Sequence, residues 1–202
     1  KLTTVVSDQY TIRTGLSEEY QTIQLLDIYK PWLGTSGFGL SYDLYRVYAN
    51  DGSIFWENEL KLEQATVDLG LRYDFWFPGE YVEGSMEDPT LYLITSAMRE
   101  NFKSTTFELL GHRGKGNLSP RFGFSAPIAK NSSFFFDYGR LSRKPNPQYL
   151  YAQLYSSAES VYQLRGNPNL NSERVISYET GIKSMLSEND ALSIVGYYRS
   201  IY

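Results

Sequence analysis

The side chains that could support catalysis or hold a metal are few and widely spaced. The single histidine, His112, stands in the polar run His112–Lys115, with no carboxylate adjacent to it. A metal centre built on one imidazole needs further ligands close by, so we interpret His112 as a solvated loop residue. The chain contains no cysteine, which excludes disulfides, thiolate metal ligands and cysteine nucleophiles. We therefore expect no metal site.

The motifs of two large enzyme classes are missing as well. Gly111, Gly114 and Gly116 are closely spaced, but they lack the preceding strand and following helix of a phosphate-binding loop, and no Gly-Lys-Ser/Thr follows. The sequence has no Gly-x-Ser-x-Gly nucleophile elbow. We expect this chain not to be an enzyme, with neither catalytic residues nor a cofactor.

Charged residues instead alternate with apolar ones. Glu57, Glu59, Glu63 and Asp68 are spaced for an exposed edge or the wall of a water-filled space, and not for a catalytic pair. We expect a second set to form ion pairs across neighbouring strands, because opposite charges side by side stabilise a sheet modestly. This set comprises Arg72, Asp74, Arg121, Asp137 and Glu179. Contact with a ligand or with another part of the protein is the alternative.

Aromatic side chains in the polar stretches are the candidates for ligand binding. These are Tyr81, Tyr92, Tyr149, Tyr151 and Tyr155. Such rings can stack on a sugar or a chelate, but they can equally pack the loops against one another. We favour loop packing, and the ligand-contacting residues stay unknown at this stage.

Composition narrows the class of protein. Of the 202 residues, 16% are aromatic, and tyrosine alone occurs 18 times, which favours β-strands. The net charge of −4 leaves no basic stripe for phosphates, so we expect no nucleic-acid partner. No apolar run reaches the roughly 18 residues of a transmembrane helix. The mean hydropathy of −0.39 suits a soluble protein, but also a membrane barrel, whose strands are half polar.

The clearest strand runs from Thr66 to Phe77. One face carries only apolar residues, aliphatic first and aromatic last: Val67, Leu69, Leu71, Tyr73, Phe75 and Phe77. A strand that crosses a membrane needs roughly 9–11 residues, longer than most soluble strands. The order of side chains is typical of a lipid-facing row that ends in an aromatic girdle.

Similar alternation predicts about seven long strands joined by loops that are alternately very short and long. The expected ranges are 8–29, 55–62, 66–77, 119–128, 134–140, 176–186 and 192–202. Between them, Pro78–Leu118 is predicted to be polar and irregular, with a short helix near Pro89–Asn101. The predicted fold is all-β: a segment of an antiparallel transmembrane β-barrel with long extracellular loops and short periplasmic turns. Strands 66–77, 134–140 and 192–202 run outward.

Three segments resemble TonB-dependent outer-membrane receptors. Leu69–Trp76 (LGLRYDFW) is similar to a strand of that family, and Leu118–Ile128 with the following FFFDYGR is similar to its Ser-Pro-Arg hairpin. Gly166–Lys183 (GNPNLNSERVISYETGIK) resembles its Gly-Asn-Pro-x-Leu loop and next strand, with Ser172-Glu173 where Pro-Glu is common. The likeness is greatest to Bacteroidetes-like receptors that carry a carboxypeptidase-regulatory-like domain.

The resemblance implies a bacterial outer-membrane barrel of about 22 strands that encloses a plug. It implies uptake of a scarce solute, such as a siderophore, cobalamin, a glycan or a peptide, powered by the TonB complex acting through the plug. Residues 1–202 would then be one part of the barrel, without the plug and the remaining strands. KLTTVVSDQY at the N-terminus is no signal peptide, so we expect the chain to begin inside a longer protein. The expected partners are outer-membrane lipid, TonB and a small solute or chelate.

Two alternatives stay open. A small complete outer-membrane barrel with an adhesive or structural role would need an eighth strand between Trp32 and Tyr48. A soluble β-rich binding domain would use the same alternation. An odd number of strands argues against a complete bacterial barrel, and an open sheet would leave two long edges unpaired.

Overall fold

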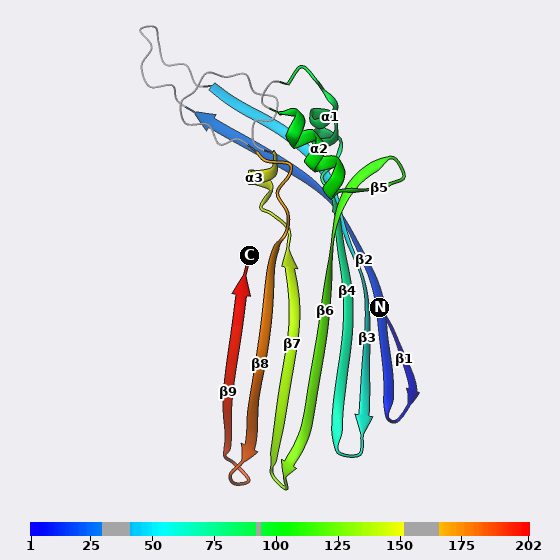
Figure 1. Ribbon diagram of the computed structural model, residues 1–202, viewed down its shortest axis with the longest axis vertical. Helices are drawn as coiled ribbons and strands as arrows, with labels where there is room; N and C mark the ends of the chain where they lie inside the picture. Colours follow the sequence, from blue (N-terminus) through cyan, green and yellow to red (C-terminus); the bar gives the residue numbers. More distant parts are fainter. Residues whose placement is uncertain (30–40, 92–93, 152–165) are drawn as a thin grey trace.

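The computed structural model describes residues 1–29, 41–91, 94–151 and 166–202. In this part of the chain a single antiparallel sheet has the order β1-β2-β3-β4-β6-β7-β8-β9, with β5 paired to β6 beside it. The strands stand next to one another in chain order, and β1 and β9 form the two open edges (Figure 1). The sheet is therefore not closed within these residues.

The bounds of the strands show how far they exceed soluble strands. They are β1 Leu2–Ser7, β2 Tyr10–Tyr29, β3 Ser41–Leu62, β4 Ala65–Phe77, β5 Phe107–Leu109, β6 His112–Ala129, β7 Ser132–Arg143, β8 Glu173–Met185 and β9 Ala191–Ile201. Three helices lie in the connections: α1 Glu80–Glu87, α2 Ser96–Thr105 and α3 Pro147–Tyr151. None of the helices in the described residues is both long and apolar enough to span a membrane.

The seven predicted strands are all present, with corrections at several ends. β3 begins at Ser41 and not at Phe55, because it pairs residue by residue with the long strand β2 up to Ser41 opposite Tyr29. The strands β1 and β5 were not predicted, since neither carries a clear apolar alternation. The expectation of an irregular Pro78–Leu118 was wrong: it holds α1, α2, β5 and the start of β6. The predicted helix lies later, at Ser96–Thr105.

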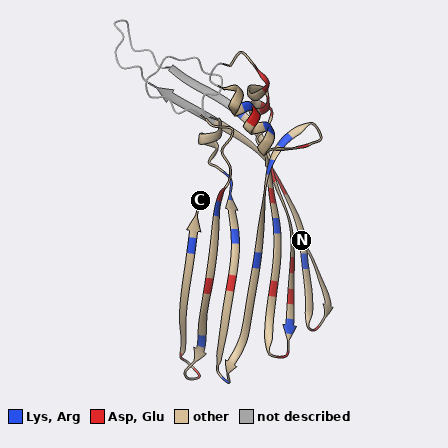
Figure 2. Ribbon diagram, in the orientation of Figure 1, with Lys and Arg blue, Asp and Glu red and all other residues tan. Residues whose placement is uncertain are grey.

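The register places like side chains in rows across the sheet. One row begins with Leu69 of β4 opposite Phe122 of β6. It continues across the neighbouring strands through Tyr138 and Tyr178 to Tyr198. This apolar face is bare, with Leu69 46% and Tyr198 65% exposed. Charged residues occur along the strands between these positions (Figure 2). An apolar face this extended is stable only against lipid or another apolar partner.

A compact core lies at the end of the sheet away from the tight strand-to-strand turns (Figure 1). We call this region the cap; it comprises α1, α2 and α3 with the adjoining ends of β3 and β4. Its buried side chains are Val47, Trp76, Val82, Met86, Ile94, Phe102, Leu150 and Tyr151. The core of the described chain therefore sits in the cap, while the sheet below it has none of its own.

Backbone geometry and one arginine shape the cap. Gly79 precedes α1 at φ 88°, and a Cβ there would meet the Tyr48 carbonyl oxygen of β3 at 1.9 Å, so only glycine fits. Behind α1, the Arg99 guanidinium donates to the carbonyls of Met86, Asp88 and Leu91 at 2.5, 2.6 and 3.3 Å. A cation at the C-terminal end of a helix satisfies carbonyls that have no partner within the helix.

The segment between α1 and α2 is held by short polar contacts. The Thr90 hydroxyl and backbone N–H donate to the Asp88 carboxylate at 2.6 and 2.8 Å, and these bonds hold the pKa of Asp88 below its usual value. Thr95 caps α2 by accepting a hydrogen bond from the Met98 N–H at 3.2 Å. These local contacts fix how the two helices lie on the sheet end.

Candidate functional site

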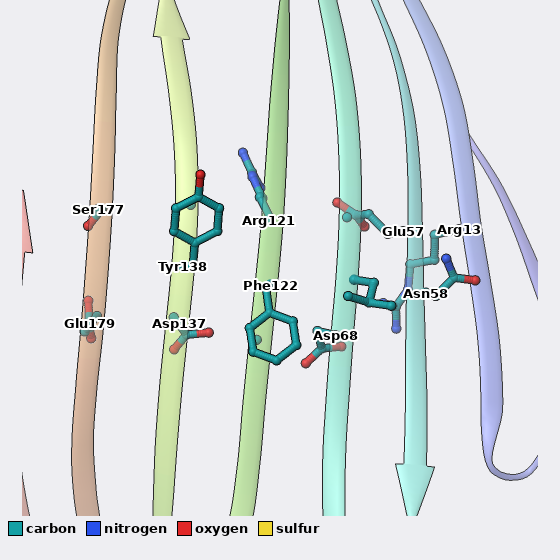
Figure 3. Close-up of a pocket in the computed structure, with 14 residues that line it drawn as sticks. Arg13, Glu57, Asn58, Asp68, Arg121, Phe122, Asp137, Tyr138, Ser177 and Glu179 are labelled. Atoms are coloured by element: carbon teal, nitrogen blue, oxygen red, sulfur yellow. The ribbon is translucent and has the colours of Figure 1, made fainter. Parts of the chain in front are cut away.

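The polar face of the sheet is hollowed about halfway along the strands. This lower hollow has a volume of about 400 Å³, and Figure 3 shows the side chains around it. Asp68 of β4, Asp137 of β7 and Glu179 of β8 lie at a similar height, because Asp68 pairs with Gly123, Gly123 with Asp137, and Asp137 with Glu179. Three carboxylates thus share one row of the sheet.

Glycines create the space between these charges. Gly123 separates Asp68 from Asp137, and a Cβ on it would lie 3.0 Å from an Asp137 carboxylate oxygen. In the next row, Arg121 stands between Gly70 and Gly139. A large charged residue flanked by two residues without side chains leaves room on both sides. The hollow therefore follows from the alternation of glycine and charge across strands that are distant in sequence.

The predicted cross-strand ion pairs were wrong for the five residues named above. Arg72 pairs with Asp74 at 2.7 Å, along β4 itself. Within the described residues, Arg121, Asp137 and Glu179 form no ion pair. Charges without an ionic partner on the sheet are available to a second body that enters the hollow.

A cross-strand ion pair does form at the edge of the lower hollow. Arg13 of β2 contacts Glu59 of β3 at 2.6 Å, and Lys61 contacts the same carboxylate at 3.1 Å. Alternation alone could not identify Arg13 as the partner, because the pairing depends on the register of β2 and β3.

A second hollow, the upper hollow, lies on the polar face next to the cap and has a volume of about 420 Å³. Trp76 lines it and also belongs to the cap core. Lys144, which follows β7, crosses it to form an ion pair with Asp51 of β3 and donates to the Gln21 amide oxygen at 3.2 Å. The Arg72–Asp74 pair lines the same hollow.

A buried lysine fixes the loop beside the upper hollow. Lys115 of β6 is only 3% exposed, and its ammonium group donates to the carbonyls of Asn169 and Leu170 at 2.9 and 3.0 Å and to the Asn171 amide oxygen at 3.1 Å. Nearby, the Asn117 amide donates to the Ser172 hydroxyl at 2.8 Å. Lys115 was not among the candidate residues, because its partners lie 54 to 56 positions away in the chain and its place opposite Trp76 follows from the register of β4 and β6.

The tyrosine candidates fall into different environments. Tyr151 is 1% exposed in the cap core, and its ring meets that of Tyr81 edge-on at 6.5 Å. Burial, together with the nearby Asp51 carboxylate, raises the pKa of Tyr151, so its phenol stays neutral. Tyr149 is 52% exposed and open to a ligand. Tyr92 and Tyr155 lie outside the described residues.

His112 is exposed but is not a free loop residue. It begins β6 after the turn at Leu110 and Gly111, both with positive φ, and its Nδ1 lies 3.3 Å from a Glu83 carboxylate oxygen of α1. The same carboxylate accepts from the Arg113 N–H at 3.0 Å. Among the described residues, no three His, Asp or Glu side chains gather as a metal site would require. The contact therefore joins the β5–β6 hairpin to the cap.

Comparison with protein families decides the class. A family model described as TonB dependent receptor-like, beta-barrel, matches residues 2–202. The chain belongs to this family. TonB-dependent receptors are outer-membrane proteins of Gram-negative bacteria, so the alternative of a soluble binding domain was wrong. No match was found among curated proteins.

Solved TonB-dependent receptors have the same arrangement of strands. The FrpB iron transporter of Neisseria meningitidis is 17% identical, with a TM-score of 0.57 over 98% of this chain and 28% of its own. The copper transporter OprC is 12% identical, with a TM-score of 0.56 over 96% and 28%. The Serratia marcescens hemophore receptor HasR, solved with HasA and heme, is 17% identical, with a TM-score of 0.52 over 95% and 34%.

Membership of this family assigns each face and each end of the sheet to a side of the membrane or barrel. The bare apolar face of a TonB-dependent receptor barrel meets lipid, and the hollowed polar face lines the lumen. The tight turns, such as the one between β3 and β4, are periplasmic, and the cap is extracellular. The chain spans about a quarter to a third of the length of the transporters it matches.

Proposed function

We propose that residues 1–202 form part of the barrel wall of an outer-membrane transporter that takes up a scarce solute with energy supplied through TonB. The plug and the remaining strands belong to the same polypeptide outside this segment, as does any carboxypeptidase-regulatory-like domain. The function is transport and not catalysis. The open edges at β1 and β9 support this proposal, since unpaired backbone groups cannot remain in hydrocarbon.

The observation that carries the proposal is the contrast between the two faces. The outer face exposes apolar rows such as Leu69 to Tyr198, whereas the inner face has two hollows and charges without an ionic partner. Unpaired charges inside a barrel cost less when a second polar body neutralises them. A plug at the lower hollow and a solute at the upper hollow would each supply such groups.

Membership of the family does not define which class of solute this protein transports. FrpB is an iron transporter, OprC a copper transporter and HasR a hemophore receptor, so the solved structures differ in what they take up or bind. For this chain we propose a small solute or chelate that enters from the cap side and meets the upper hollow first. The exposed Tyr149 is a candidate contact on that route.

Untargeted measurement of solute depletion tests this function without choosing a solute beforehand. Cells with the complete gene, cells without it and cells without TonB would be compared for the compounds that disappear from the medium. We expect at least one compound to remain in the medium of both deletion strains while the parent strain removes it. Equal depletion by all three strains would refute uptake and favour the small complete barrel with a structural role.

A further inference from the structure

The apolar outer face of the sheet ends in aromatic side chains next to the cap. On β4, Tyr73, Phe75 and Phe77 follow one another, with ring centroids 6.4 and 6.0 Å apart. The exposed Tyr20 of β2 lies level with Phe77, because both residues pair with Asn50 of β3. In membrane barrels such rings gather where the wall meets the lipid headgroups. These four aromatic residues, which we call the aromatic band, therefore mark the extracellular interface of the membrane.

The β5–β6 hairpin continues the aromatic band beyond the wall. Its Phe107 ring meets the Phe77 ring edge-on, with centroids 5.6 Å apart. Gly114 of β6 stands opposite Phe107 and makes this contact possible, since a Cβ there would lie 2.8 Å from each of the two rings. The hairpin is thus rooted on the lipid-facing side of β4, and it stands out sideways from the end of β6 (Figure 1).

The tip of the hairpin is apolar and bare. Leu109, on the same side of β5 as Phe107, is 52% exposed, and Leu110 is 92% exposed. Leu110 has φ 53°, a left-handed conformation that turns usually give to glycine or asparagine, so turn geometry does not explain a leucine here. Two residues of strand advance about 7 Å, which keeps the tip within reach of the headgroup layer.

The charges of the hairpin are matched within the protein. The Arg113 guanidinium lies 3.4 Å from the Glu108 carboxylate, and the His112 Nδ1 lies 3.3 Å from the Glu83 carboxylate of α1. The hairpin therefore carries no excess of positive charge for lipid phosphates, which attract clusters of unpaired cations. An occupant of the tip is recognised by its apolar surface and not by its charge.

We propose that the β5–β6 hairpin docks on the outer leaflet of the membrane beside the barrel, with Leu109 and Leu110 inserted among the lipid chains. Lipid is the occupant because the hairpin is continuous with the lipid-facing side of the wall through the contact of Phe107 with Phe77. Docking removes the leucines from water, which is the main source of affinity of interfacial segments. Since Glu83 joins the hairpin to α1, a docked hairpin also holds the cap at a fixed height above the membrane. This contact goes beyond the proposed uptake function and holds for any solute.

Spin labels on the complete receptor test this contact. Leu110→Cys carries the label at the tip, and Glu100→Cys, at an exposed position of α2, carries it in the cap as the matched control. Any cysteine elsewhere in the receptor is replaced by serine. In phosphatidylcholine vesicles we expect the label at position 110 to collide more often with oxygen, which dissolves in lipid, than with a water-soluble nickel chelate. The label at position 100 should show the reverse order.

Removing the neighbouring leucine should weaken docking. With the label at position 110, Leu109→Ser should lower the ratio of docked to free hairpin about tenfold, the effect of losing one buried aliphatic side chain. Thr105→Ser, at an exposed position of α2, keeps the hydroxyl that donates to the Asn101 carbonyl and should leave the ratio unchanged. Because both positions are exposed, the thermal unfolding of each variant should match that of the parent receptor.

Four results would overturn the proposal. Equal exposure of both labels to the nickel chelate would place the tip in water. Exclusion of both oxygen and the chelate from the label at position 110 would mean that protein covers the tip, either another loop or a second copy. Docking only in vesicles that contain phosphatidylglycerol would assign the contact to headgroup charge, and an unchanged ratio in Leu109→Ser would remove the apolar insertion. Each of these results would leave the uptake function standing.

Discussion

Two glycines of this sheet differ in how much space surrounds them. At Gly181 of β8 a Cβ would lie 2.4 Å from the backbone carbonyl oxygen of Ile194 and 2.8 Å from the Phe135 ring. At Gly139 of β7 nothing lies within 4 Å. Both glycines face the lumen, yet only Gly181 is required by its surroundings, because a backbone atom cannot swing aside as a side chain can.

This contrast predicts different costs for the same change. Gly181→Ala should lower the free energy of unfolding of the complete receptor by about 1–3 kcal/mol, the usual cost of overpacking. Gly139→Ala should stay within about 0.5 kcal/mol or stabilise slightly, since alanine restricts the unfolded chain. Urea unfolding in lipid vesicles measures both. Equal effects of the two substitutions would contradict the close approach of the Ile194 carbonyl to Gly181.

At the scale of elements, two polar anchors tie loops and strand ends next to the cap to the barrel wall. Lys115 of β6 holds the loop that carries Asn169, Leu170 and Asn171, and Lys144 joins the end of β7 to β3. Each anchor joins segments far apart in sequence. The loops above the strands therefore have defined positions, which a receptor that captures a solute needs.

Removing the first anchor should release the loop. Lys115→Met keeps the aliphatic stem but leaves the carbonyls of the half-buried Asn169 and Leu170 without their donor, which costs about 1–3 kcal/mol. We expect faster cleavage by protease within residues 166–172, with the strands intact. Lys130→Met is the control, because Lys130 is exposed in the turn between β6 and β7. A loop as resistant as in wild type would mean that Lys115 does not hold it.

At the scale of the whole molecule, the stability of the sheet depends on the membrane around it. The described residues have one continuous core, in the cap, and the outer face of the strands is covered only when lipid lies against it. Leu71 is 41% exposed on that face, and Arg72, its neighbour, faces the lumen. The two adjacent positions therefore face different environments, lipid for Leu71 and the lumen for Arg72.

Opposite substitutions at these positions test the assignment of faces. Leu71→Arg should cost about 2–4 kcal/mol if Leu71 lies near the bilayer midplane. Arg72→Leu removes a half-exposed ion pair with Asp74 and should cost about 0–1 kcal/mol. Folding of the complete receptor into vesicles, followed by denaturant titration, gives both values. Similar losses at the two sites would contradict the facing described above.

Sequence alone was enough to find the strands and their faces. Along Thr66–Phe77 the alternation of side chains is a local property, because successive residues of any strand point to opposite sides. The same rule located the other long strands and the tight turns, except that it missed residues 41–54 of β3. It was weak at β1 and β5, where pairing with a neighbour, and not composition, makes the strand.

Only the tertiary structure determined which residues of different strands and helices are neighbours. Asp68, Gly123 and Asp137 become neighbours through the registers of three strands, and Trp76 joins the cap through helices that follow it. Register and loop packing depend on contacts between residues far apart in the chain, which no local pattern encodes. The fold class and the facing of the strands could therefore be predicted from the sequence. The hollows, the anchors and the unpaired charges depend on how the strands are placed side by side, which only the tertiary structure shows.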